Sequence, residues 1–364
     1  MRYLAIFVFA FFLPGLALSA DTAAFKVVRG YTEAPGTTRE VSNMPRVRTQ
    51  GQLPMCYAMT ASVVAQRHIC NLKGIADCAN LTGAEKSIEI SPLSMLAWSK
   101  VSSPERAVDS FLSYLSLDFT GGGSSTTALA VGGDYFVFAK DSCFDFDKFV
   151  RHYGSISSTP EQAEEKAIQW ELAYAELKYV FEKNKNPSLR AAMKTPSSSP
   201  QDECIDCVLV NRNLFTRIDR KRPDEALEKN SFREFLYNLL LGNCGRFAFA
   251  PRPTWQVYPG PGQTTSKDEL RQKIMRVVDN KLPVALQGIC LSRDGANECT
   301  QFHSVVIAGH KQVCITPGNC RILFKVHNSW GIEWQDQYDN GWVDANSILE
   351  NINYSRNGML SWYE

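Results

Sequence analysis

The sequence has no excess of charge of either sign, since 39 lysine and arginine residues stand against 38 aspartate and glutamate residues among its 364 residues. Beyond the first 20 residues, it also has no apolar run long enough to span a bilayer. Such a chain has no electrostatic basis for binding nucleic acid or a membrane surface. We therefore expect neither partner for the processed protein.

The sequence is also poor in clusters that hold metal ions. Cys204 and Cys207 have the spacing of half a zinc site, but no second pair of this kind and no suitably spaced pair of histidines accompanies them. A disulfide role is the better interpretation of these two cysteines. We expect neither a metal nor another cofactor.

Residues 1–20 have the composition of a secretory signal peptide. They contain one basic residue, Arg2, then an apolar core at 4–12, a Pro-Gly break and small residues ending at Ala20. Removing them takes away one basic residue and no acid, so the formal net charge changes from +1 to 0. We expect a secreted or periplasmic, and in either case extracytoplasmic, protein. The signal suits a bacterial envelope or a eukaryotic secretory route.

Eleven cysteines in an exported chain indicate an oxidising compartment. If Cys56 is kept free, as argued below, ten remain and can form five bridges. Closeness in the sequence and the turn-forming residues between them predict three pairs: Cys70 with Cys78, Cys290 with Cys299, and Cys314 with Cys320. The pairing of four others stays open, namely Cys143, Cys204, Cys207 and Cys244.

Residues 50–65 place a lone cysteine, Cys56, at the start of an almost wholly apolar segment. A helix made of this segment is apolar all round and belongs inside a sizeable domain. Pro54 interrupts any earlier helix, so Cys56 falls in the first turn, where free N–H groups and the helix dipole favour a thiolate. Thiolates attack carbonyl carbons, as an acyl-transfer nucleophile must. Taken alone, the pattern is more typical of a buried structural cysteine.

A thiolate nucleophile also needs a base, a group that orients the base, and donors for an oxyanion. The segment FHSVVIAGH supplies His303, and CRILFKVHNSWG supplies Asn328 with Trp330 two residues later. Gln50 stands six residues before Cys56. The chain order of glutamine, cysteine, histidine and Asn-Ser-Trp-Gly resembles the papain family of cysteine peptidases.

The resemblance implies a role for each of these residues. Cys56 would be the nucleophile and form a thioester during peptide-bond hydrolysis. Its own N–H and the side-chain amide of Gln50 would stabilise the oxyanion. His303 would pair with the thiolate and later protonate the leaving amine, while Asn328 would fix the imidazole. Trp330 would cover the bond between them and border the substrate site.

The resemblance also implies an α+β, papain-like fold of two domains, the left helical and the right a barrel-like antiparallel β structure. It lapses between about residues 150 and 246, where the residues themselves predict an inserted helical subdomain. The corresponding division is a signal peptide at 1–20, an extended lead-in at 21–48, the nucleophile domain at 49–150, a helical insertion at 151–250, and the domain carrying the histidine and asparagine at 251–364.

Gly122 and Gly123 would form a wall of the substrate cleft, where the lack of side chains lets an extended peptide pair with the glycine backbone. The alternative is that these glycines form a flexible turn. A helix is expected over 126–140, after these glycines. One departure concerns the nucleophile: the family usually has Cys-Gly-Ser-Cys-Trp, and this chain has LPMCY at 53–57. The upstream cysteine and its disulfide are therefore missing.

The sequence of the insertion predicts two helices. The first is amphipathic and ends at about residue 183, with Ala175 and Tyr179 among its recurring apolar positions, and the second covers 231–241. Its role is either packing on the scaffold or a lid that restricts substrates. The lead-in is too short for the long helical pro-domain of papain-like zymogens. Control would instead come from a short propeptide, a proteinaceous inhibitor, the compartment or the insertion.

Two other functions fit the same residues. The thioester could be resolved by an amine, which would make the protein a transpeptidase or deamidase. The chain could also be a catalytically silent, peptide-binding homologue, although intact Gln50, Cys56, His303 and Asn328 argue against this. We expect a peptide or protein substrate and a monomer. Neither substrate preference nor the choice between endopeptidase and exopeptidase follows from the sequence.

Overall fold

The structure is a computed structural model that describes residues 23–51, 53, 55–92, 95, 123–135, 138–139, 141, 146–150, 175, 177–186, 222–232, 235, 246–247, 253–354 and 358–364. The signal peptide at 1–20, Gly122, and the four cysteines without assigned partners lie outside the described residues and stay predictions. The division into domains also stays a prediction.

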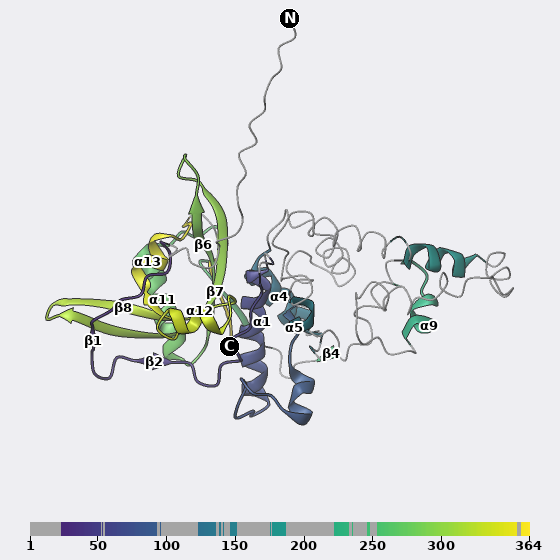
Figure 1. The fold of residues 1–364 in the computed structure, drawn as a ribbon, viewed down its shortest axis with the longest axis horizontal. Coiled ribbons are helices and arrows are strands. Elements are labelled where there is room, and N and C mark those ends of the chain that lie inside the picture. Colours follow the sequence, from purple (N-terminus) through teal and green to yellow (C-terminus); the bar gives the residue numbers. More distant parts are fainter. Residues whose placement is uncertain are drawn as a thin grey trace, which may run out of the picture.

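The described helices and strands are shown in Figure 1. The helices are α1 (Cys56–Leu72), the 3-10 helix η1 (Gly83–Ile88), α4 (Ser125–Tyr135), α5 (Phe146–Phe149), α9 (Arg222–Leu227), α11 (Lys267–Asp279), α12 (Ile332–Gln337) and α13 (Ala345–Glu350). The strands are β1 (Thr32–Glu33), β2 (Arg39–Glu40), β3 (Phe138–Ala139), β4 (Arg246–Phe247), β5 (Trp255–Tyr258), β6 (Val284–Arg293), β7 (Cys299–Thr316), β8 (Asn319–His327), β9 (Trp342–Asp344) and β10 (Leu360–Tyr363).

The main sheet is antiparallel and runs in the order β5-β10-β6-β7-β8-β9, with β1 and β2 also paired to β7. Helices together with an antiparallel sheet confirm the α+β class. The expected barrel-like closure is wrong for the strands that the structure describes, since β5 and β9 lie at opposite ends and do not pair. Alternating branched residues predict a strand and its inward face, but they do not determine whether a sheet closes.

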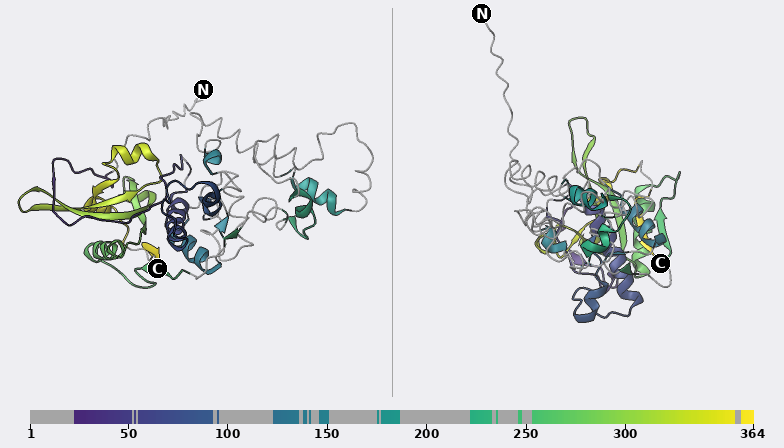
Figure 2. Two further views of the ribbon diagram at one scale, coloured as in Figure 1. Left: turned by 90° about the horizontal axis from the view of Figure 1, so that it is seen from below. Right: turned by 90° about the vertical axis from the view of Figure 1, so that its right-hand side faces the viewer.

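Helix α1 begins at Cys56, as expected from the interruption before it. Its residues from Tyr57 to Arg67 are all buried, which confirms a helix that is apolar on most of its surface. The helix packs against β7, β6, β10 and α4. Figure 2 shows α1 and α4 side by side next to the sheet. Burial on every side gives the first residue of α1 a rigid support.

Helix α11 and the central strands follow the sequence pattern closely. Ser266 caps α11 and accepts from the backbone N–H of Glu269, whose side chain accepts in return from Ser266, so the sequence SKDE at 266–269 forms a capping box. Strands β6, β7 and β8 cover three runs that are rich in branched residues. Together they carry the segments that contain His303 and lead into Asn328.

The lead-in is part of the sheet and the core. Its strands β1 and β2 pair with β7, and Ala24 and Phe25 are both completely buried. The carbonyl of Lys26 accepts a hydrogen bond of 2.8 Å from the N–H of Asp344. Removing these residues as a short propeptide would therefore take two strands and a core aromatic ring from the fold.

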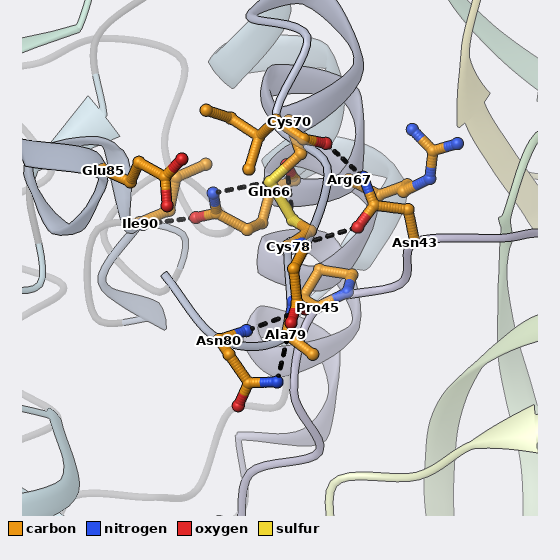
Figure 3. Close-up of a disulfide and its surroundings, with 12 residues drawn as sticks. Asn43, Pro45, Gln66, Arg67, Cys70, Cys78, Ala79, Asn80, Glu85 and Ile90 are labelled. Atoms are coloured by element: carbon orange, nitrogen blue, oxygen red, sulfur yellow. Dashed lines mark hydrogen bonds between the residues drawn. A yellow bond between two sulfur atoms is a disulfide. The ribbon is translucent and has the colours of Figure 1, made fainter. Parts of the chain in front are cut away.

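A second set of contacts ties the lead-in to α1 beside the disulfide Cys70–Cys78 (Figure 3). The side chain of Asn43 accepts from the N–H of Cys78 at 2.5 Å and donates to the carbonyl of Ile75 at 2.6 Å. Arg67 of α1 donates to the carbonyl of Ser42 at 2.8 Å. The lead-in thus contacts both α1 and the sheet.

Three disulfides predicted from the sequence are confirmed: Cys70–Cys78, Cys290–Cys299 and Cys314–Cys320. Among the described cysteines, Cys56 is the one that is free. None of the described helices has the length and apolar character needed to cross a bilayer.

In the predicted insertion, the helix that ends near residue 183 buries a different face from the one expected. Ala175 and Tyr179 are exposed, and Tyr179 keeps 57% of its surface accessible. The buried residues are instead Leu177, Val180 and Phe181, and the Phe181 ring contacts that of Phe235 at 5.2 Å between centroids. The sequence contains apolar residues on both faces, and the larger aromatic contact determines which face is buried.

Candidate active site

His303 and Asn328 form a hydrogen-bonded pair in the sheet. His303 lies on β7, and Asn328 directly follows the end of β8, the neighbouring strand. The Nε2 atom of His303 is 2.9 Å from Oδ1 of Asn328, and both residues are buried. Because an amide oxygen only accepts, Nε2 carries the hydrogen and Nδ1 keeps a lone pair. Nδ1 is thus the ring atom available for accepting a proton.

Trp330 and Phe25 enclose the imidazole. The Trp330 indole stacks on His303 with 4.5 Å between ring centroids and 23° between the planes. Phe25 meets His303 edge-on at 6.2 Å and contacts Trp330 at 5.8 Å and Trp334 at 5.4 Å. Burial lowers the pKa of His303 to about 4, against a smaller opposing effect of the bond to Asn328. The imidazole is therefore neutral at ordinary pH.

Phe25 was not among the residues singled out from the sequence. Its only local signal is the segment AAFKVV at 23–28, which is small or apolar except for Lys26 and interrupts an otherwise polar lead-in. No motif connects that run to a histidine almost 280 residues later. Phe25 becomes part of the site only because the lead-in crosses the sheet.

Cys56 occupies the first position of α1, which packs against β7. The groups that lower the pKa of its thiol are the backbone and hydroxyl of Ser304 and the backbone of Tyr57 and of Cys56 itself. Ser304 directly follows His303 on β7. The helix therefore brings the thiol to the strand segment that carries the imidazole.

The electrostatics of the thiol differ from the expectation of a preformed thiolate. Burial raises the pKa of Cys56, and the polar groups of Ser304 and of the first turn of α1 lower it by less. Together with the low pKa of His303, this favours a neutral thiol and a neutral imidazole. Moving one proton from sulfur to Nδ1 would keep the two residues neutral overall, but each charge would then need polar groups to stabilise it.

Gln50 lies in a tight turn before α1, next to the segment after Asn328. Its backbone N–H donates to the carbonyl of Ser329 at 2.8 Å, and its side-chain oxygen accepts from the hydroxyl of Ser329. Its side-chain nitrogen donates to the carbonyl of Leu53 at 2.6 Å, which uses one of two amide hydrogens. The neighbouring residue, Thr49, forms a β-bridge with Trp330. One amide hydrogen of Gln50 remains for a ligand.

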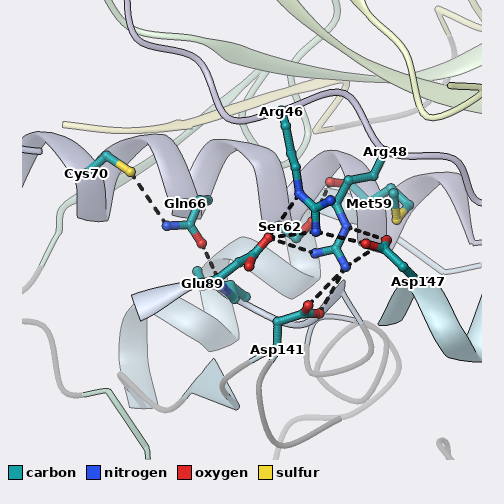
Figure 4. A network of polar contacts seen from close by, with 10 residues as sticks. Arg46, Arg48, Met59, Ser62, Gln66, Cys70, Glu89, Asp141 and Asp147 are labelled. Atoms are coloured by element: carbon teal, nitrogen blue, oxygen red, sulfur yellow. Dashed lines mark hydrogen bonds and ion pairs between the residues drawn. The ribbon is translucent and has the colours of Figure 1, made fainter. Parts of the chain in front are cut away.

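A partly buried charge cluster, with Arg48 and Asp141 at its buried end, holds the chain just before Gln50 (Figure 4). Arg48 donates to both oxygens of Asp141 at 3.1 Å and to Asp147 at 3.0 Å. Arg46 pairs with Glu89 at 3.0 Å and with Asp147 at 2.9 Å. Burial, with Glu89 and Asp147 nearby, raises the pKa of Asp141 to about 7. These partners are more than 40 residues apart in the sequence, so no local pattern predicts the cluster.

Gly123 lies against the side chain of Tyr57, which follows Cys56. A Cβ atom at Gly123 would come within 2.2 Å of Cε2 of Tyr57, so only glycine fits there without movement. The structure therefore brings Gly123 close to the start of α1. Gly122 lies outside the described residues.

Comparisons with known proteins leave the family open. No protein-family model matches the chain, and no curated protein matches it either. Among solved structures, the chain is similar to digestive procathepsin L 3 of Tenebrio molitor larval midgut, with 10% identity and a TM-score of 0.38 over 94% of this chain and 76% of that one. It is also similar to SERA5E from Plasmodium falciparum, with 12% identity and a TM-score of 0.36 over 93% and 96%. Likenesses this low carry no functional conclusion.

Proposed function

We propose that this protein is an exported cysteine peptidase that hydrolyses peptide bonds through a thioester on Cys56. One observation carries the proposal: helix α1, which begins at the free Cys56, packs on β7, and β7 carries a histidine whose Nε2 is bonded to Asn328. A nucleophile, a base and a group that orients the base thus come from three distant segments. A buried structural cysteine would have no need of this arrangement.

In the proposed reaction, Nδ1 of His303 takes the proton of Cys56 and the thiolate attacks the substrate carbonyl carbon. The N–H of Cys56 and the remaining amide hydrogen of Gln50 stabilise the oxyanion. The C–N bond then breaks, and the amine leaves with the proton from His303. Water, deprotonated by the same imidazole, attacks the thioester and releases the acid and the thiol. Asn328 keeps the ring in one tautomer throughout.

The surrounding residues have supporting roles in this proposal. Trp330 excludes water from the bond between His303 and Asn328, and it borders the substrate. Gly122 and Gly123 provide main-chain groups to an extended peptide. Three short disulfides support an oxidising, extracytoplasmic location for the chain after its signal peptide is removed. We propose a monomer that acts on peptides or proteins, with a proteinaceous inhibitor as a further partner.

The test is covalent labelling of the mature protein with a thiol-directed epoxide, followed by digestion of peptides with a mass readout. We expect one label on Cys56 and products that have gained water. His303→Ala should abolish both. His310→Ala is the matched control, since His310 lies on the same strand and is bonded to Asp279 at 2.9 Å, so labelling should persist.

Other outcomes distinguish the alternatives. Products that join two peptides would indicate a transpeptidase, and conversion of glutamine to glutamate would indicate a deamidase. If native protein takes no label at Cys56, or takes it equally in His303→Ala, the enzyme assignment is wrong and a peptide-binding role is favoured.

A further inference from the structure

Gln287 is a polar residue in the apolar first half of strand β6, which packs against α1. It lies on β6 opposite Ser304 of β7, whose backbone and hydroxyl lower the pKa of Cys56. A register shift follows Gln287, where Gly288 has a φ of +83°. Such a bulge redirects the neighbouring side chain. The carboxamide of Gln287 reaches the start of α4.

The oxygen and nitrogen of this carboxamide have different partners. Oε1 accepts from the backbone N–H of Ser125 at 3.0 Å, from its hydroxyl at 3.0 Å and from the hydroxyl of Ser124 at 3.2 Å. Nε2 donates to the carbonyl of Gly358 at 2.7 Å. A backbone N–H can only donate and a carbonyl can only accept, so the orientation of the amide is fixed.

These contacts connect three segments of the chain. The carbonyl of Gly358 also accepts from the hydroxyl of Thr126 at 2.8 Å, and the N–H of Gly358 donates to the carbonyl of Pro259 at 3.1 Å. The start of α4, strand β6 and the residues before β10 therefore meet at a single side chain. Ser125 is completely buried, so its N–H depends on Gln287 for a partner.

We propose that Gln287 is a positioning residue that holds Gly123, Ser124 and Ser125 beside Cys56, so that the main chain of an extended substrate aligns with the thiol. Gly123 directly precedes the two serines and touches the ring of Tyr57. Movement at Ser125 therefore displaces the glycine backbone relative to the start of α1. This role rests on the proposed peptidase function.

The test uses Gln287→Met, which keeps the length of the side chain and loses all four hydrogen bonds. For an extended peptide substrate we expect KM to rise about 10-fold, which corresponds to losing roughly one net hydrogen bond. The rate at which a small epoxide labels Cys56 should stay within about twofold, since a small reagent does not use the glycine backbone. The matched control is Gln256→Met on β5, which loses a bond to Glu364. It should change neither KM for the peptide nor the rate of epoxide labelling.

A second variant, Gln287→Glu, tests the same contacts by pH. A protonated carboxyl can still accept from Ser125 and donate to Gly358, whereas an ionised carboxylate repels that carbonyl oxygen. The activity of the variant relative to wild type should therefore be highest in acid and fall as pH rises through the pKa of the new carboxyl. Thermal unfolding of each variant accompanies both assays.

Three results would overturn the role. The first is Gln287→Met with an unchanged KM for extended peptides. The second is an equal loss of epoxide labelling, which indicates a general structural effect. The third is a pH-independent ratio for Gln287→Glu. If wild-type protein neither labels nor cleaves, the peptidase function fails and this role fails with it, whereas an active wild type limits the failure to Gln287.

Discussion

The imidazole of His303 lies almost flat against the indole of Trp330, with 4.5 Å between ring centroids. The stack covers one face of the ring, and the edge of Phe25 contacts it as well. The pKa of His303 is therefore lowered to about 4 by burial, with the bond to Asn328 intact. Water exclusion around this ring determines the pH at which it can accept a proton.

Trp330→Ala should move the acid limb of activity to higher pH. Opening the stack admits water, which raises the pKa of His303 from about 4 towards its ordinary value of 6.5 and leaves less neutral imidazole at pH 5. The measurement is the rate of Cys56 labelling between pH 4 and 8. Trp330→Phe keeps an aromatic ring and should shift the limb less. An acid limb that stays in place in Trp330→Ala would contradict this role of the indole.

Phe25→Ala should destabilise the protein by about 3–5 kcal/mol, because a completely buried ring that contacts three other rings is lost. Phe25→Leu should lose less stability, since leucine fills most of the volume of the ring. Denaturant unfolding measures the free energy of unfolding of both variants.

Protein trimmed before Val47 loses β1 and β2 as well as Phe25 and should not fold cooperatively in the same measurement. Trimmed protein with wild-type stability and activity would restore the propeptide interpretation.

Gly123→Ala and Tyr57→Ala should be strongly non-additive. The alanine Cβ would lie 2.2 Å from the Tyr57 ring, and overpacking of this kind costs about 1–3 kcal/mol. Removing the ring removes the clash, so the double variant should be less destabilised than the sum of the single variants. Tyr57→Phe keeps the ring and should give no relief. Additive free energies of unfolding in the double variant would show that the two residues do not touch.

Asp141→Asn should become more stable relative to wild type as pH rises from about 4 to 7. The folded-state pKa of Asp141 is raised to about 7 from 3.8, so its contribution is complete in acid and is lost as pH rises through that interval. The difference should grow by at most roughly 1.4 kcal/mol per pH unit.

The groups that face Asp141 are Arg48, Glu89 and Asp147, with Arg46 joined to the same cluster. The depressed pKa of His303 acts in the opposite sense, because its stabilisation is lost as pH falls from 6.5 towards 4. His303 titrates in both wild type and Asp141→Asn, so taking the difference in their free energies of unfolding at each pH cancels its contribution. Parallel stability curves for wild type and Asp141→Asn would contradict the raised pKa.

Unfolding the protein without reductant should expose one reactive thiol, that of Cys56. Three disulfides account for six of the eleven cysteines. Besides Cys56, four cysteines remain, and these are predicted to form two further bridges. The measurement is thiol titration in denaturant, with Cys56→Ser as the control that should read zero. Three or more thiols in wild type would contradict the five-bridge prediction.

Local sequence patterns predict the parts of this protein that depend on near neighbours. The start of α1 at Cys56, the capping box of α11 and three short disulfides each follow from a few adjacent residues. The order of the proposed site residues could also be seen, because each stands beside a recognisable strand or apolar helix.

What the sequence does not reveal depends on contacts between distant segments. Phe25 reaches His303, and Gln287 reaches Ser125, only because the chain crosses the sheet. The same holds for the pKa of Cys56: the first turn of a helix favours a thiolate, but burial by other elements outweighs it. The open sheet is a further case, since strand patterns do not determine the partners of the outer strands.

The attachment of the lead-in has a consequence for folding. Lys26 donates to Ser347 across 321 residues of chain, and strand β1 waits for β7. The lead-in must therefore remain unpaired during folding until β7 and Ser347 are available to it. The ring of Phe25 can cover His303 only after these distant contacts form, so we expect the burial of the imidazole to be among the late events of folding.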